Sequence, residues 1–249
     1  MRTEEIAPER LEEAQGFVER LEAEIGSYIH AVADGPFVQA VTDGSFPIDG
    51  IRFVHTNHYH LIINDMANLN YYVARARNEE EMLFFHFMAA EEKNHLLTLF
   101  LLTDALGIGR DELRASEPHA PCLLRTNYFS RLAQCGTPGD IALAILLNFP
   151  VWAAGAKNEA AGLRRHYGLG KAVPGTDKRD TDILDRFATA TEGFRASALR
   201  IIARDLVGTG SRARLERAGR WAVEYEAMVW QTYYADGLLH GTRGGRTTG

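Results

Sequence analysis

The chain contains almost no cysteine. Among its 249 residues only Cys122 and Cys135 are present, which excludes a disulfide framework and a metal knuckle built from cysteines. Cys122 follows a proline and Cys135 precedes a turn glycine. We interpret both as structural residues, because nothing in the sequence around them indicates an activated thiol.

Long apolar runs and an excess of positive charge are also missing. The longest purely apolar run, residues 141–147, is far shorter than the roughly 20 residues of a membrane-spanning helix. A net charge of -6 argues against nucleic acid as the main partner. The first residues, Met-Arg-Thr-Glu-Glu, are not typical of a secretory signal peptide. We therefore expect a cytoplasmic protein that binds neither nucleic acid nor membrane.

Proline is rare where the chain has helical periodicity. None of the eight prolines lies between Ile48 and Glu117, and none follows Pro174. These stretches repeat apolar residues at helical spacing, without strand alternation. Helices are predicted over residues 8–33, 49–77, 79–106, 122–134, 138–167, 181–207 and 211–236. The pattern predicts an all-α, single-domain bundle of seven to eight helices over residues 1–240, with a flexible, glycine-rich tail over residues 241–249.

Two polar residues interrupt the apolar stripe of the predicted helix 49–77. His58 and Asp65 fall in the same stripe as Leu61 and Ile62. In a helical bundle, inward-facing polar side chains usually build the functional site. His58 is therefore either a hydrogen-bonded core histidine or, together with Asp65, part of a pocket wall. His60 lies in a second, more polar stripe and is the weaker candidate.

The predicted helix 79–106 contains a carboxylate–imidazole pair. His95 is three residues after Glu92 and four after Glu91, and both glutamates lie within roughly 60° of His95 around a helix. A Glu-x-x-His arrangement is found in the iron sites of helical bundles. The pair predicts non-haem iron as the candidate cofactor, with Glu91, Glu92 and His95 as ligands. The alternative is an exposed acidic patch, and the choice between the two glutamates stays open.

A third candidate, Glu226, lies on the predicted helix 211–236. It precedes Trp230 by four residues, so the two side chains share one face of the helix. A carboxylate within an aromatic stripe is a candidate general acid or base, with a raised pKa if it is buried. The alternative is a glutamate at the solvent edge of that stripe.

The order of these features resembles the haem-oxygenase-like superfamily that includes the TenA thiaminase-II proteins and PqqC. The resemblance covers roughly residues 28–236. It implies that Glu226 is catalytic, that the fold is a TenA/PqqC-type helical bundle, and that the chain forms a homo-oligomer (a dimer or larger). The stretches that carry it are Asp43-Gly-Ser-Phe-Pro-Ile-Asp49, Asp104-Ala-Leu-Gly107, Ala142-Leu-Ala-Ile-Leu-Leu147 with Trp152, and Glu226-Ala-Met-Val-Trp230.

The sequence departs from this family at several functional positions. Pro150 stands where TenA hydrolases have the catalytic cysteine, two residues before the tryptophan. The family's pocket Gln-Asp pair aligns with Asn57 and His58. In the related dimetal oxidases a His-x-x-x-Asp-x-x-His segment would fall over residues 187–194. That segment lacks histidine here and has Glu192 alone as a donor.

We therefore expect an enzyme that acts on a small, nitrogen-containing metabolite of a biosynthetic pathway. An oxidase is favoured, either iron-dependent or cofactorless as in PqqC, because a neutral imidazole at His58 suits ligation or proton transfer near pH 7. The alternatives are a TenA-type hydrolase or lyase using Glu226 without a thiol, and a non-catalytic binding protein. The predicted catalytic residues are Glu226 and His58, and the predicted substrate-binding residues are Asn57, Leu61, Asp65, Phe149, Trp152 and Trp230.

Overall fold

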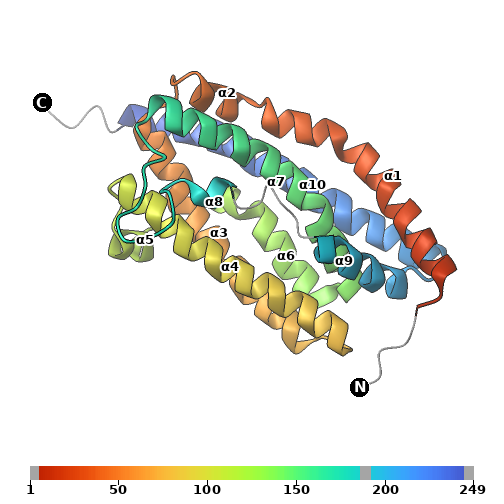
Figure 1. Ribbon diagram of the computed structural model, residues 1–249. Helices are drawn as coiled ribbons and strands as arrows, with labels where there is room; N and C mark the ends of the chain where they lie inside the picture. The colour runs from red at the N-terminus through yellow and green to blue at the C-terminus, as the bar shows by residue number, and fades with distance from the viewer. Residues whose placement is uncertain (1–5, 186–191, 244–249) are drawn as a thin grey trace, which may run out of the picture.

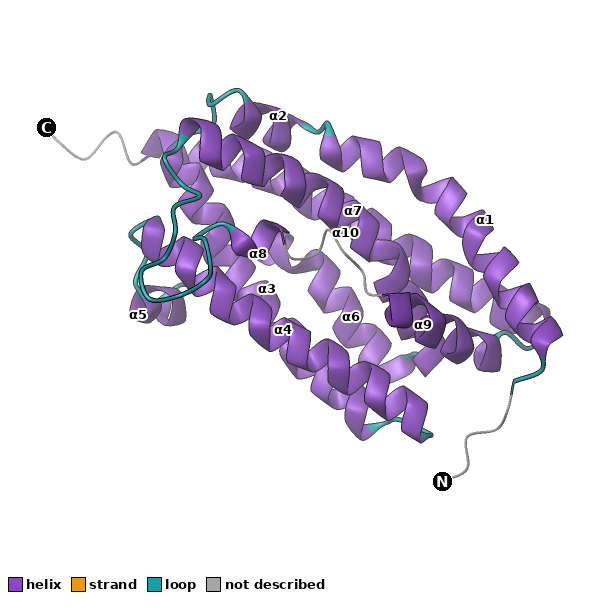
Figure 2. Ribbon diagram, viewed as in Figure 1, coloured by secondary structure: helices purple, strands orange, loops and turns teal. Residues whose placement is uncertain are grey.

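The computed structural model describes residues 6–185 and 192–243. The described chain is built of helices joined by short loops, and it forms no strand, only an isolated bridge between Ala172 and Arg179 (Figure 2). The predicted all-α, single-domain bundle is confirmed. Its helices are α1 (Pro8–Ala33), α2 (Pro36–Thr42), α3 (Ile48–Ala74), α4 (Glu79–Ala105), α5 (Arg110–Ala115), the 3-10 turn η1 (Ala120–Leu123), α6 (Leu124–Cys135), α7 (Pro138–His166), α8 (Asp182–Asp185), α9 (Glu192–Asp205) and α10 (Gly208–Arg243).

The predicted boundaries differ from the observed ones mainly near the C-terminus. The predicted helix 181–207 corresponds to α8 and α9, and residues 186–191 lie outside the described part of the chain. Helix α10 continues through residues 241–243 of the predicted tail, whereas residues 244–249 are not described. Gly241 packs so closely against Pro47 that a Cβ atom would lie 2.3 Å from Cγ of that proline. A residue with a side chain would therefore not fit at this position of α10.

Helix α7 forms the centre of the bundle. Thr137 caps it with a reciprocal capping box to Asp140, and Pro138 supplies a preset backbone angle in the first turn. The helix contacts α1, α2, α9 and α10. By length and composition it is apolar enough to cross a membrane, but 72% of its most apolar window is buried inside the bundle. A core helix has this same composition.

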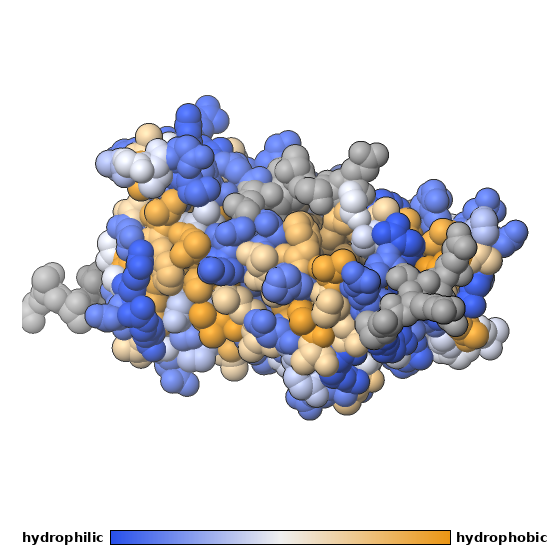
Figure 3. All heavy atoms as spheres, turned by 60° about the horizontal axis from the view of Figure 1, so that its bottom comes forward, coloured by the Kyte–Doolittle hydropathy of each residue, from blue (hydrophilic) through white to orange (hydrophobic). Residues whose placement is uncertain are grey.

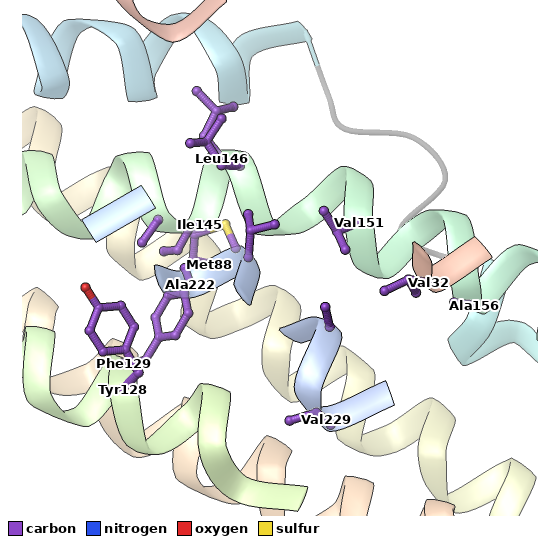
Figure 4. Close-up of a cluster of buried hydrophobic side chains, with 14 of the residues drawn as sticks. Val32, Met88, Tyr128, Phe129, Ile145, Leu146, Val151, Ala156, Ala222 and Val229 are labelled. Atoms are coloured by element: carbon purple, nitrogen blue, oxygen red, sulfur yellow. The ribbon is translucent and has the colours of Figure 1, made fainter. Parts of the chain in front are cut away.

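The remaining long helices pair along their lengths. Helix α3 packs against α4, α10 packs against α7, and α6 contacts α3, α7 and α10 (Figure 1). Figure 4 shows side chains of α4, α6, α7 and α10 in one buried apolar cluster, including Met88, Phe129, Ile145 and Ala222. This packing brings α3, α4, α6 and α7 together around the polar residues that interrupt their apolar faces.

Several large apolar side chains remain on the surface of α3 and α4. Figure 3 shows apolar groups separated by hydrophilic residues rather than one continuous apolar area. The exposed apolar residues of α3 and α4 are Ile48, Ile63, Tyr71, Met82, Leu83, Phe87 and Leu97.

Candidate functional site

A cavity of about 80 Å³ lies between α3, α4, α6 and α7. Aromatic and aliphatic side chains from all four helices form most of its wall, and seven polar side chains complete it. The apolar lining is Leu61, Leu69, Tyr72, Met88, Phe129, Ile145, Phe149 and Trp152, and the polar lining is His58, Asp65, Asn68, Glu92, His95, Arg125 and Asn148. A mostly apolar pocket with a few convergent polar groups is typical of a small-molecule site.

A buried ion pair joins α3 to α6 at the cavity wall. Nη2 of Arg125 donates to Oδ2 of Asp65 over 2.6 Å, and the Thr126 hydroxyl donates to Oδ1 over 2.5 Å. Burial nevertheless raises the pKa of Asp65 from 3.8 to about 6; Arg125 opposes this rise and the nearby Glu92 carboxylate adds to it. Asp65 is therefore able to take up and release a proton close to neutral pH.

This raised pKa predicts a pH-dependent stability. The folded state holds the Asp65 proton more tightly than the unfolded state does, so the associated stability is present below pH 3.8 and is lost as the pH rises to about 6. Over that range, the wild-type free energy of unfolding should fall relative to that of Asp65→Asn, by at most about 1.4 kcal/mol per pH unit. Urea denaturation at a series of pH values measures it. The exposed control Asp111→Asn should track wild type, and a parallel course for Asp65→Asn would contradict the prediction.

Glu226 lies one layer behind the wall, buried on α10. Its Oε1 accepts from the Trp230 indole N–H over 2.7 Å, and its Oε2 accepts from Asn148 over 3.1 Å. Nε of Arg125 is 3.0 Å from Oε2. Neither Glu226 nor Trp230 lines the cavity, because their polar atoms bond to each other and to Arg125 and Asn148. In this arrangement Glu226 is the second counter-ion of Arg125 and orients Asn148.

His58 lies at the wall and faces aromatic and cationic neighbours. Its ring centroid is 6.0 Å from that of Trp152. Burial lowers the pKa of His58 well below its ordinary value, and the positive charges of His55, His95 and Arg125 lower it further. The imidazole is therefore neutral near pH 7 and can accept a proton.

The structure distinguishes Glu92 from Glu91. Glu92 is buried at the wall, and its Oε2 lies 3.1 Å from Nδ1 of His95. Glu91 is only half-buried, accepts a hydrogen bond from Asn94 and does not line the cavity. Glu92 is thus the inward carboxylate, because it alone falls on the face of α4 turned toward α3 and α7.

Asn57 does not line the cavity, although it was predicted to bind substrate. Its amide donates to the Phe53 carbonyl over 2.9 Å and accepts from the His119 backbone over 2.8 Å. It therefore fixes the loop before η1 to α3. His60 likewise bonds to Ser116, 2.8 Å away. Of the predicted binding residues, the structure brings Leu61, Asp65, Phe149 and Trp152 together at the wall.

Comparison with known proteins agrees with this architecture. The model of the TENA/THI-4/PQQC family matches residues 18–235. The chain belongs to this family. Among curated proteins no relative matches it.

Solved structures of TenA-like proteins have the same fold. A TenA homologue from Pseudomonas syringae is 12% identical, with a TM-score of 0.72 over 94% of this chain and 99% of that one. A domain with a heme oxygenase-like fold from Shewanella denitrificans is 14% identical, with a TM-score of 0.71 over 92% and 96%. A protein described as a TenA-like thiaminase from Sulfolobus solfataricus is 13% identical, with a TM-score of 0.60 over 88% and 96%. At these identities the likeness establishes the fold alone.

The donors that this TENA/THI-4/PQQC protein places around the cavity do not fit the predicted iron. No group of three His, Cys, Asp or Glu side chains is placed to hold a metal ion in the described residues. Asp65 is bound by Arg125 and Thr126, and Glu92 pairs with His95. The fixed cation of Arg125 also disfavours a metal ion beside it. The segment aligned with the metal-binding motif of the dimetal oxidases was predicted to lack most of the metal ligands. The side chains of its residues 187–192 lie outside the described part of the chain.

The thiols of this family member lie away from the cavity. Cys122 is buried, and burial raises the pKa of its thiol to about 12, with the Asp236 carboxylate adding to the rise. Cys135 is exposed at the end of α6. Neither lines the cavity, so neither thiol is placed to act as a nucleophile there.

The contribution of α6 is what the sequence interpretation missed. Arg125 precedes Phe129 by four residues and Leu132 by seven, so a charge stands in the apolar stripe of a short helix. His58 on α3 is a candidate for the same reason, because it is a polar residue within an apolar stripe. A charged residue within an apolar stripe is rarely fully buried unless it is paired. The position of Arg125 in such a stripe therefore indicates a buried ion pair.

Proposed function

We propose that the chain is a metal-free acid–base enzyme that oxidises a small nitrogen-containing molecule bound in the cavity. The observation that carries this proposal is that His58 and Asp65 both line the cavity. Burial lowers the pKa of His58 and raises that of Asp65 to about 6. A molecule bound in the cavity would therefore meet a proton acceptor, His58, and a carboxyl group that exchanges its proton near neutral pH, Asp65.

The lining supports a flat, hydrogen-bond-donating substrate. Phe129, Phe149 and Trp152 offer aromatic faces on which a ring can stack. Arg125, the arginine among the described lining residues, is already paired with Asp65 and with Glu226. The carboxylates of Asp65 and Glu92 and the neutral imidazole of His58 stand at the wall as hydrogen-bond acceptors, which favours an amine or a nitrogen heterocycle that donates N–H bonds.

The proposed reaction needs only these residues and dioxygen. The neutral imidazole of His58 accepts one proton from the substrate, and the ionised Asp65 carboxylate accepts a second. Both residues then pass these protons to the reduced oxygen. The substrate thus loses two electrons and two protons. Dioxygen takes up the two electrons and the two protons and leaves as hydrogen peroxide. The apolar walls support the proposal because they exclude water from the reactive form of the substrate.

A TenA-type hydrolase or lyase is the second candidate, because one structural neighbour is described as a TenA-like thiaminase. Glu226 would be its acid or base. Its two oxygens, however, are engaged by Trp230, Asn148 and Arg125, and the cavity has no thiol. The geometry therefore favours oxidation.

The test is a set of turnover assays on chelator-treated protein with aminomethyl-pyrimidines and related amine-bearing heterocycles. We expect protein-dependent oxygen uptake with stoichiometric peroxide. Amine release without oxygen uptake, lost in Glu226→Gln, would replace the oxidase with the lyase or hydrolase. A shift of melting temperature without any turnover would indicate a binding protein. Turnover that requires added Fe(II) would overturn the metal-free mechanism.

A further inference from the structure

A second titratable pair lies behind the cavity wall. His55 of α3 is 1% exposed and Glu159 of α7 is 3% exposed. Nε2 of His55 lies 3.2 Å from Oε1 of Glu159. Neither residue lines the cavity, and neither takes part in the site described above.

A buried ion pair such as His55–Glu159 is not an efficient way to stabilise a fold. Both ring nitrogens of His55, and Oε1 of Glu159, are buried and form no hydrogen bond of ordinary geometry with the described residues. A buried ion pair regains its desolvation cost only when further hydrogen bonds satisfy it, and well-packed apolar residues often stabilise a protein more. An apolar pair of similar volume would hold α3 to α7 at least as well.

The pair adjoins the cavity wall on both of its helices. On α3, His55 precedes His58 by one turn, and the two ring centroids are 6.2 Å apart. On α7, Glu159 follows Trp152 by two turns, and Trp152 contacts His58. Glu159, His55 and His58 thus form a connected series from the interior to the cavity.

We propose that Glu159 and His55 are positioning residues for His58: Glu159 retains a proton on His55, and this buried positive charge keeps His58 neutral and ready to accept a proton. The inference rests on the proposed acid–base role of His58. After burial, the charge on His55 is the largest influence that lowers the pKa of His58.

Other charged groups also face His58, and they remain in place in the variants proposed below. His95 from α4 and Arg125 from α6 act in the same direction as His55. Asp65 from α3 and Glu92 from α4 line the same cavity, and Glu226 from α10 lies behind Arg125. Tyr233 from α10 is uncharged, since burial raises its pKa well above its ordinary value.

The direction in which the pKa of His58 shifts when Glu159 is removed distinguishes this arrangement from a direct effect of Glu159 on His58. If Glu159 acted on His58 directly, its negative charge would favour the imidazolium, and removing it would lower the pKa of His58. If Glu159 acts through His55, removing it lets His55 lose its proton, and the pKa of His58 then rises. Loss of His55 itself must have the same effect.

The experiment is an NMR titration of the histidine rings in the ¹⁵N-labelled full chain, with the His58 signals identified by their loss in His58→Gln. We expect the pKa of His58 to rise by about 1 unit in His55→Gln and in Glu159→Gln, and no further in the double variant. Asp34→Asn, which removes the carboxylate 3.7 Å from the exposed His30, should leave His58 unchanged. A fall in Glu159→Gln, or no change in His55→Gln, would overturn the proposal.

Two additions keep the test decisive. Glu159→Asp retains the charge and should titrate as wild type does, so it separates loss of the charge from a change of side chain; if Glu159→Gln does not fold, His55→Gln decides the proposal. A wild-type-like titration of His58 is the result expected from Glu159→Asp, and a rise would count against the inference. The titration needs no substrate, so a shift as expected in a protein without turnover would refute the proposed function and leave the coupling intact. Where turnover is found, the acid limb of kcat/KM should move with His58.

Discussion

Replacing Arg125 by methionine should lower the free energy of unfolding at pH 7 by about 3–5 kcal/mol. Arg125 is the shared partner of Asp65, 2.6 Å away, and of Glu226, 3.0 Å away. Methionine fills a similar volume but leaves two buried carboxylates without a cation. Urea denaturation followed by circular dichroism gives the value, and for a chain of this size the melting temperature should fall by about 10 °C.

The matched control for this variant is Arg114→Met. Arg114 forms an ion pair with Asp111 at a surface where both side chains are exposed, so its loss should change stability by less than about 0.5 kcal/mol. The deficit of Arg125→Met should also shrink at pH 5, because a protonated Asp65 no longer needs a counter-charge. A deficit below about 1 kcal/mol at pH 7 would show that Arg125 does not hold the two carboxylates in place.

Replacing His58 by glutamine should reduce kcat by about 10²–10⁴-fold, with little change in KM. Glutamine keeps a polar side chain of similar size at the wall but cannot accept a proton. The folded state should be retained, because the neutral imidazole carries no charge that another residue must balance. The measurement is steady-state turnover with the substrate found in the oxygen-uptake assays.

The same helix supplies the control for His58→Gln. His60 is two residues further on, bonds to Ser116 and stands outside the cavity, so His60→Gln should keep wild-type turnover within about threefold. Equal losses in both variants would indicate damage to α3 and not to the acid–base group. A loss confined to KM would indicate that His58 binds substrate without taking its proton.

Much of the fold was predictable because helical periodicity is a local property. The spacing of apolar residues and the positions of proline predict α1, α3, α4 and α7 to within a few residues. The same periodicity places His58 and Asp65 in an apolar stripe, which indicates burial. It also limits the inward carboxylate of α4 to Glu91 or Glu92, since both lie close to His95 around the helix.

Other parts of the site depend on how helices distant in sequence pack together. Glu226 and Trp230 resemble a catalytic motif, yet they lie behind the wall because α6 inserts Arg125 between α10 and the cavity. Asn57 shares the region of His58 on α3 but is used by the loop before η1. No periodicity within one helix contains this information.

Apolar spacing, proline position and isolated charges within apolar stripes are readable residue by residue, and they are enough to predict an all-α bundle with titratable groups inside it. Only the tertiary structure decided which groups meet. Arg125 joins two carboxylates from α3 and α10, and His55 of α3 faces Glu159 of α7 across the interior. The physical reason is that the charge state of a buried group is set by neighbours within a few ångströms, which long-range packing supplies.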